Sequence, residues 1–194
     1  MRTKFSRENG KIEIFTGVYV LVLLAVILVA QIQIRLFMTV SSYVEDALAA
    51  SNLASAIIDV EEYGKTHIIR ITSPDMAYEL YRDALKHNLG LDENWENSNK
   101  DLISGRVKVL KYEIYNVNKQ DIIVYSFGEE GDSVREIPGG LGKVVTPDGV
   151  VVESTSIYSK IGFPVKGIWG IEIAAKKHKT VDIVSENTES QVLN

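Results

Sequence analysis

The stretch NGKIEIFTGVYVLVLLAVILVAQIQIR, from Asn9 to Arg35, decides how the rest of the chain is arranged. No charged residue occurs in it from Ile14 to Ile34. About 20 residues of α-helix cross the hydrocarbon core of a bilayer, and this run reaches that length. Because lipid offers no hydrogen-bond partners, the backbone there must be helical. The sequence therefore predicts a transmembrane helix over residues 12–38.

Positive charge in residues 1–11 predicts the orientation of this helix. By the positive-inside rule, a basic leader stays in the cytoplasm and the chain after the span is exported. Arg35, beyond the span, is a single opposing charge. A secretory signal cleaved after Ala30 is the alternative, although the apolar pattern continues through Met38 without a helix breaker. The basic residues of the leader are Arg2, Lys4, Arg7 and Lys11.

The segment after the span, residues 39–63, contains neither proline nor internal glycine. Its apolar residues recur at helical spacing, with polar residues between them. Gly64 is a suitable C-terminal stop. We therefore expect one helix from about Ser6 to Tyr63, whose second part packs an amphipathic face on a folded domain. A free stalk or a coiled-coil dimer is the alternative.

The exported domain is expected to occupy residues 64–184. Thr66 to Thr72 is predicted to be a strand. Ser73 as N-cap, Pro74 at the first helical position and Gly90 as C-terminal stop predict a helix between them. The polar stretch from Leu91 to Lys100 follows as a loop.

The remainder of this domain is rich in β-branched and aromatic residues, which favours strands. Asn118-Lys119 separates two such runs and predicts a hairpin, with a bulge near Val109 and Leu110. The segment from Glu129 to Gly142 reads as turns, and Pro147-Asp148-Gly149 predicts a second hairpin. Further strands are expected on either side of a joint at Pro164 and Gly167, with a short last strand at 180–184. The polar tail, 185–194, completes an α+β fold with an antiparallel sheet.

Composition excludes several functions. The 194-residue chain has a net charge of −5, whereas nucleic-acid binders carry a basic face, so we expect no nucleic-acid partner. It has no cysteine, hence no disulfide framework and no thiolate metal site. His67, His87 and His178 stand far apart, so no metal site is expected. We also expect no cofactor and no catalytic residues, and therefore no enzyme.

Tyrosine is abundant in the exported domain. Such residues suit a contact surface in an assembly. They also suit sheet and helix cores, with the hydroxyl at the edge, and we expect this core role to prevail. The tyrosines concerned are Tyr63, Tyr78, Tyr81, Tyr112, Tyr115, Tyr125 and Tyr158.

The leader RENGKIEIFTGVYVLVLL, with Gly10, Lys11 and Glu13, resembles the N-terminus of type IV pilins and of the TadE-like minor pilins of Tad (Flp-type) pilus systems. Those proteins have a basic leader, a glycine, an early glutamate and a helix whose second half packs on an antiparallel sheet outside the membrane. The resemblance implies leader processing after Gly10 and a role of Glu13 in assembly. In the family, however, the glutamate is the fifth residue after the glycine, whereas Glu13 is the third.

Taken together, these features predict a single-pass membrane protein with its N-terminus inside and its C-terminal domain outside the cytoplasm. It would serve as a structural or assembly component of a pilus-like or secretion machine. Its partners would be the lipid bilayer and sister pilin-like subunits or pilus assembly proteins. The alternatives are a membrane-tethered binding or sensor module, a secreted domain, and an exported enzyme.

Overall fold

The computed structural model describes residues 5–97, 103–167 and 171–183. The chain forms two compact units, Met1–Thr39 and Val40–Asn194, which we call the N-terminal and the C-terminal unit. The fold is α+β, with one long apolar helix, a five-stranded antiparallel sheet and shorter helices. This confirms the predicted fold class.

Helix α1 runs from Phe5 to Ser55 and is therefore shorter than the predicted helix to Tyr63. A separate short helix, α2, covers Val60–Thr66. Gly64 lies inside this helix, so the predicted helix end at Gly64 is wrong. The break arises because Ile58 pairs with Ile71 in an isolated antiparallel bridge, which a helix would prevent. This tertiary contact overrides the local helical pattern.

The predicted strand from Thr66 to Thr72 is absent; only Ile71 makes a bridge. The side chain of Asn116, instead of the backbone of a neighbouring strand, forms hydrogen bonds with the backbone of this segment. The Asn116 amide accepts from the Ile71 N–H at 2.9 Å and donates to the Ile71 carbonyl at 2.8 Å. The segment is thus fixed by side-chain hydrogen bonds without joining a ladder.

Helix α3, Pro74–Leu89, confirms the helix predicted between Ser73 and Gly90. Gly90 has φ +61°, the left-handed conformation that glycine adopts at low cost. The Ser73 side chain makes no capping hydrogen bond, so proline at the first position and the glycine carry the boundary signals. The buried face of the helix consists of Ala77, Tyr81, Leu85 and Leu89.

The sheet has the strand order β3-β2-β1-β4-β5, and every neighbouring pair is antiparallel. The first predicted hairpin is confirmed, and the register of β1 against β4 shifts between Val109 and Lys111, at the predicted bulge. The strands are β1 (Lys108–Asn118), β2 (Asp121–Gly128), β3 (Ser133–Ile137), β4 (Ser156–Lys166) and β5 (Glu172–Asp182).

Four details of the strand prediction were wrong. The segment read as turns contains β3, and the second hairpin is reduced to one bridge between Val145 and Val151. Residues predicted as a separate last strand extend β5 to Asp182. Pro164 lies inside β4 rather than at a joint between two strands. A proline can be accommodated there because it lacks only the backbone N–H, and its carbonyl still accepts a hydrogen bond from Ser104 N at 3.1 Å. The predicted tail, 185–194, lies outside the described residues.

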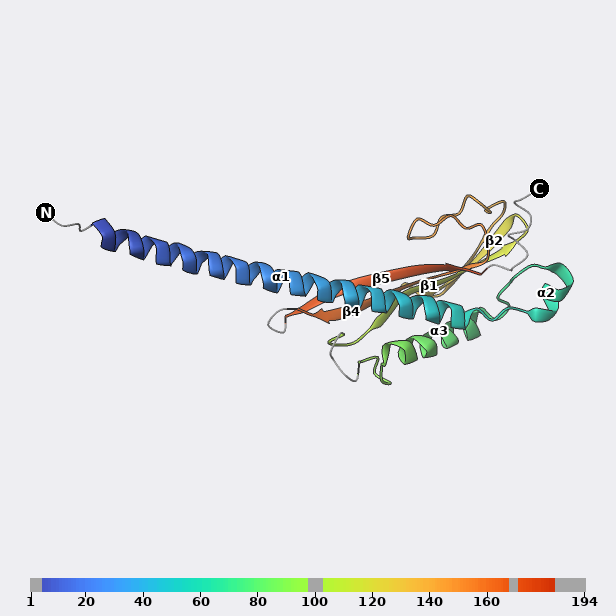
Figure 1. Cartoon of the computed structure of the whole chain (residues 1–194). Coiled ribbons are helices and arrows are strands. Elements are labelled where there is room, and N and C mark those ends of the chain that lie inside the picture. Colours follow the sequence, from blue (N-terminus) through green and yellow to red (C-terminus); the bar gives the residue numbers. More distant parts are fainter. Residues whose placement is uncertain (1–4, 98–102, 168–170, 184–194) are drawn as a thin grey trace. The chain divides into compact units, whose positions relative to one another are not determined.

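The two faces of the sheet are covered differently (Figure 1). The second part of α1 and helix α3 lie on one face, where the rings of Tyr81 and Tyr112 are 4.6 Å apart. On the opposite face the connection 138–155 covers part of the sheet. A small hydrophobic cluster forms beneath that connection, consisting of Tyr115, Ile122, Val124, Val152 and Tyr158.

Candidate functional site

The three residues predicted for leader processing and assembly lie in the first turns of α1. Gly10, Lys11 and Glu13 all have helical backbone. The side chain of Glu13 is exposed, whereas that of Lys11 lies outside the described residues. Glu13 is more than two turns inside the helix, and the helix dipole acts mainly within the first turn. The helix dipole therefore adds little at Glu13.

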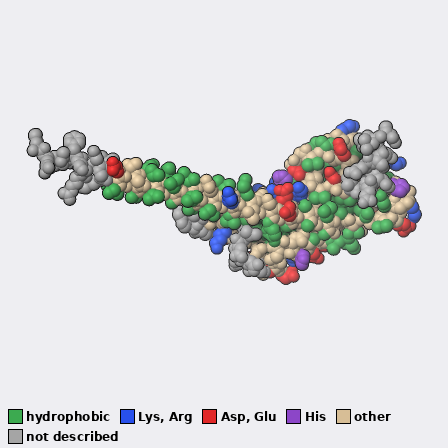
Figure 2. Space-filling view, in the orientation of Figure 1, with side chains coloured by type: hydrophobic (Ala, Val, Ile, Leu, Met, Phe, Trp, Pro, Cys, Tyr) green, Lys and Arg blue, Asp and Glu red, His purple; other side chains and the backbone are tan. Residues whose placement is uncertain are grey.

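The apolar part of α1 presents its side chains outward along the N-terminal unit (Figure 2). The most apolar stretch of 18 residues has a mean hydropathy of 2.5, and none of its residues is buried. By length and composition, α1 is suited to cross a membrane. A Cβ atom added to Gly17 would meet nothing within 4 Å, so its bare backbone is open to a neighbouring helix.

From Val40 onward, α1 buries one face in the C-terminal unit. The N-terminal part of this face is apolar and includes Val44 and Leu48, both fully buried. The C-terminal part is polar and consists of Ser51, Asn52 and Ser55, which are also fully buried. The spacing of these residues, three and four apart, is that of a single helical stripe.

Hydrogen bonds tie the polar part of this stripe to the sheet and to α3. The Asn52 amide donates to the carbonyls of Ile157 on β4, at 3.4 Å, and Lys179 on β5, at 3.0 Å. The hydroxyls of Ser55 and Tyr112 are 2.8 Å apart, and burial raises the pKa of the Tyr112 hydroxyl. Buried polar groups favour a single packing of the core when they have hydrogen-bond partners.

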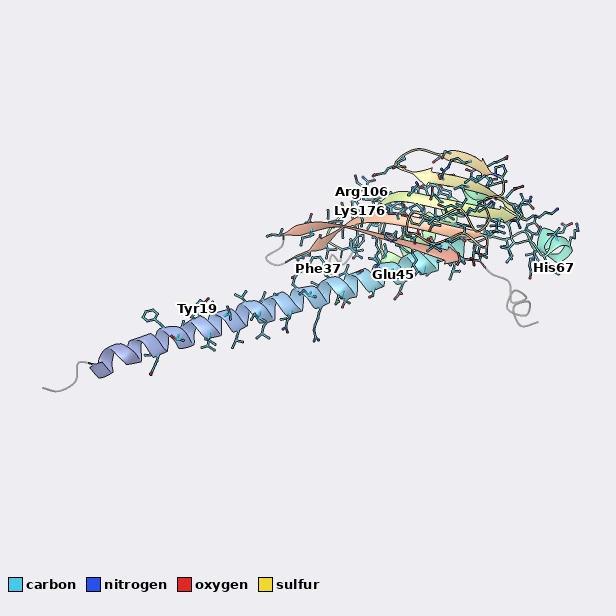
Figure 3. The ribbon with its side chains drawn as sticks, turned by 90° about the horizontal axis from the view of Figure 1, so that it is seen from above. Tyr19, Phe37, Glu45, His67, Arg106 and Lys176 are labelled. Carbon is cyan, nitrogen blue, oxygen red and sulfur yellow. The ribbon has the colours of Figure 1, made fainter. Side chains whose placement is uncertain are left out.

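Glu45 on α1 forms ion pairs with two lysines of β5. Its carboxylate lies 2.7 Å from Lys177 Nζ and 2.9 Å from Lys179 Nζ. The hydrogen bonds from Lys177 and then Lys179, together with their charges, lower the pKa of Glu45 from 4.5 to about 2. Glu45 projects from α1 beside the sheet in Figure 3.

We expect this ion pair to make folding pH-dependent. A carboxyl with a depressed pKa in the folded state stabilises the fold above its unfolded pKa, and this contribution is lost as pH falls towards 2. Since the group is partly exposed, Glu45→Gln should cost less than about 1 kcal/mol at pH 7. Urea unfolding at pH 7 and pH 2 would measure the difference between variant and wild type. It should shrink at low pH, and an unchanged difference would contradict the assignment.

The opposite face of the sheet holds a buried carboxylate, Glu113, which is 1% exposed. Its oxygens accept hydrogen bonds from Tyr115 Oη at 2.6 Å and Ser126 Oγ at 2.9 Å. Lys111 Nζ lies 3.2 Å away and Arg135 Nη2 3.8 Å away. A cavity of about 280 Å³ borders the network. Burial, and then the hydrogen bond to Glu113, raise the pKa of the Tyr115 hydroxyl.

Sequence reasoning missed the Glu113 network, although a signal for it exists. Lys111, Glu113 and Tyr115 alternate along β1 and therefore share one face of the strand. A charged pair on alternate positions of an otherwise apolar strand indicates a buried ion pair. Its partners Ser126 and Arg135 come from β2 and β3, and only the strand register identifies them.

The expected core role of tyrosine is confirmed for Tyr81, Tyr112, Tyr115 and Tyr158, which are buried. Burial and the nearby charges of Asp148 and Glu113 raise the pKa of Tyr158 to about 12. The other predicted tyrosines are partly exposed.

The three histidines are separated in the fold as well. His67 lies at the end of α2, His87 on α3 and His178 on β5, and all are exposed. Within the described residues, no group of three histidine, aspartate or glutamate side chains could hold a metal ion.

The chain matches no family model, no curated protein and no solved structure.

Proposed function

We propose that this chain is a single-pass membrane protein that serves as a structural or assembly component of a pilus-like or secretion machine. The observation that carries the proposal is the division of α1. Its first part is apolar and exposed, whereas its second part, from Val40, is built into the core of an α+β unit. The first part of such a helix suits anchorage in lipid, and its second part belongs to the core of the proposed exported domain.

The proposed mechanism is lateral packing of α1 with sister helices in the bilayer. Helices in lipid gain no hydrophobic free energy from meeting, so they associate where small residues allow close backbone contact. Gly17 offers such a position. The C-terminal unit would contact partner subunits outside the cytoplasm. Gly10, Lys11 and Glu13 support the pilin-like reading through the resemblance of the leader alone.

A membrane-tethered binding module is the second candidate function. Cavities of about 280–360 Å³ on the C-terminal unit favour it. Small-molecule sites begin at about this size.

Single-cysteine variants test the topology, because the natural chain contains no cysteine. Glu136→Cys places a thiol at an exposed position of β3, and Ser6→Cys places one before the span. A membrane-impermeant maleimide should label Glu136→Cys on intact cells and Ser6→Cys only after lysis. Labelling of both only after lysis would exclude export. Recovery of the chain from the medium with Gln31 as first residue would establish the cleaved, secreted form.

Oxidative cross-linking in membranes tests assembly. We expect Gly17→Cys to form disulfide-linked dimers at least five times more efficiently than Tyr19→Cys. The two positions point to nearly opposite sides of the helix, since each residue advances about 100°. Tyr19 projects freely in Figure 3. Equal cross-linking of both variants would indicate random collision, and absence of cross-linking in both would contradict packing through Gly17.

A further inference from the structure

A groove lined by cations and aromatic rings lies on the C-terminal unit, between α3, the segment around Trp95 and the beginning of β1. Its volume is about 310 Å³. Arg106 lies at the end of the sheet where β1 begins (Figure 3). The side chains that carry the argument are Arg82, Arg106, Lys108, Tyr78, Trp95 and Glu129.

Positive charge predominates in this groove, although the chain as a whole is acidic. Two arginines and one lysine line the groove together with one carboxylate, Glu129, whose Oε1 is 3.8 Å from Lys108 Nζ. This distance is too long for a hydrogen bond. Arg82 forms an ion pair with Glu79, which lies outside the lining. Among the described parts of the chain, Arg106 has no ion-pair partner. The groove therefore holds cationic donors that its own carboxylate does not use.

Aromatic rings hold Arg82 in place. Its guanidinium carbon is 5.4 Å from the centre of the Trp95 ring and 5.8 Å from that of Tyr78. Tyr78 in turn stacks on Phe127, with ring centres 4.8 Å apart. Arg82 Nη1 also donates to both carboxylate oxygens of Glu79, at 3.1 Å and 3.4 Å. An arginine fixed between rings loses less conformational entropy when it binds an anion.

The backbone at Trp95 is strained. Its φ of +66° lies in the left-handed region, which a bulky residue rarely adopts. Asp92 Oδ1 fixes the turn by accepting from the N–H groups of Asn94, at 2.8 Å, and Glu96, at 3.0 Å. The Trp95 carbonyl accepts from Val107 N at 2.9 Å. The local structure thus places the indole against Arg82 at a cost in backbone energy.

We propose that this groove is a binding site for a phosphate group carried on a small organic body. Arg82, Arg106 and Lys108 would neutralise the phosphate oxygens, and arginine matches their geometry with paired donors. Arg82 and Lys86 already lie over the Trp95 ring, which is 9% exposed, so the organic body would contact only this exposed part of Trp95. The phosphate belongs either to a soluble phosphorylated molecule or to the headgroup of an anionic lipid. Because the groove lies wholly within the C-terminal unit, the inference does not depend on the membrane assembly proposed above.

Tryptophan fluorescence tests this site on the full chain in non-ionic detergent micelles. Trp169→Phe leaves Trp95 as the single tryptophan. Glycerol 3-phosphate should change its emission in a saturable way, and glycerol should not. Micelles doped with phosphatidylglycerol, compared with phosphatidylcholine, form the second arm. A response to glycerol 3-phosphate assigns a soluble ligand, whereas a response to phosphatidylglycerol alone assigns a lipid headgroup.

Charge variants complete the test. Arg106→Gln and Lys108→Gln should each raise the dissociation constant at least tenfold, and Arg82→Lys should weaken binding although it keeps the charge. Lys65→Gln, on exposed α2, is the matched control and should bind like the wild type. Circular dichroism checks that each variant is folded. Absence of any saturable response, or binding that Arg106→Gln and Lys108→Gln leave unchanged, would overturn the proposal.

Discussion

Replacing Leu48 with alanine should lower the free energy of unfolding of the C-terminal unit by about 3 kcal/mol. Leu48 lies in the second part of α1 and is fully buried. The substitution removes three carbon atoms from a packed interior and leaves a cavity that the surrounding sheet and helix fill only partly. Urea unfolding of the full chain in detergent, followed by tryptophan fluorescence, would measure the loss.

Leu23→Ala is the matched control for this prediction, since it makes the same chemical change in the first part of α1. Leu23 is 46% exposed and belongs to the N-terminal unit. We expect no change in the urea midpoint of the C-terminal unit. If Leu48→Ala and Leu23→Ala behave alike, the second part of α1 is not an integral part of the domain core.

Glu113→Ala should destabilise the C-terminal unit by about 2–3 kcal/mol, because it removes the acceptor of a buried network. The buried hydroxyls of Tyr115 and Ser126 would lose their acceptor. Lys111, whose side chain is 30% exposed, can turn towards water and limits the loss. The same urea experiment would measure the change.

Glu113→Gln separates charge from shape in this network. Glutamine keeps the carbonyl acceptor and the volume of the side chain but removes the negative charge, so we expect a loss of about 1 kcal/mol. The pKa of Tyr115 should also fall, since the charge of Glu113 contributes to raising it. Equal destabilisation by Glu113→Ala and Glu113→Gln would mean that charge dominates over the acceptor.

Local sequence signals correctly predicted the elements whose boundaries depend on residues that are neighbours in the sequence. Helix α3 follows from Pro74 and Gly90, and the first hairpin follows from two β-rich runs around a short turn. The bulge near Leu110 follows from a change of alternation. In each case the backbone preference of a few neighbouring residues decides the outcome.

Contacts between distant residues decided the elements that were predicted wrongly. Helix α1 ends at Ser55 without glycine or proline, because Ile58 pairs with Ile71. Strand β3 forms in a polar, turn-rich segment because β2 offers a free edge, as in the pairing of Val124 with Arg135. The two residues of each such pair are more than ten positions apart, so a short window of sequence does not contain both of them.

The candidate sites divide in the same way. Gly10, Lys11 and Glu13 could be proposed from the sequence because they lie beside a long apolar run, and their role stays a prediction. The network around Glu113 and the groove beside Trp95 gather residues from several elements, so sequence spacing could not reveal them. The positive φ of Trp95 likewise has no sequence signal, since tryptophan rarely adopts it.

The hydrogen bonds of Asn52 and the ion pairs of Glu45 also have a mechanical consequence. Apolar contacts along a helix can be exchanged for similar ones when the helix slides by one turn, about 5.4 Å. Asn52 bridges carbonyls of two strands, and Glu45 bridges two lysines, so the second part of α1 must break these bonds before it can slide. Within the C-terminal unit, that part of α1 and the strands β4 and β5 would therefore resist a pull as one body.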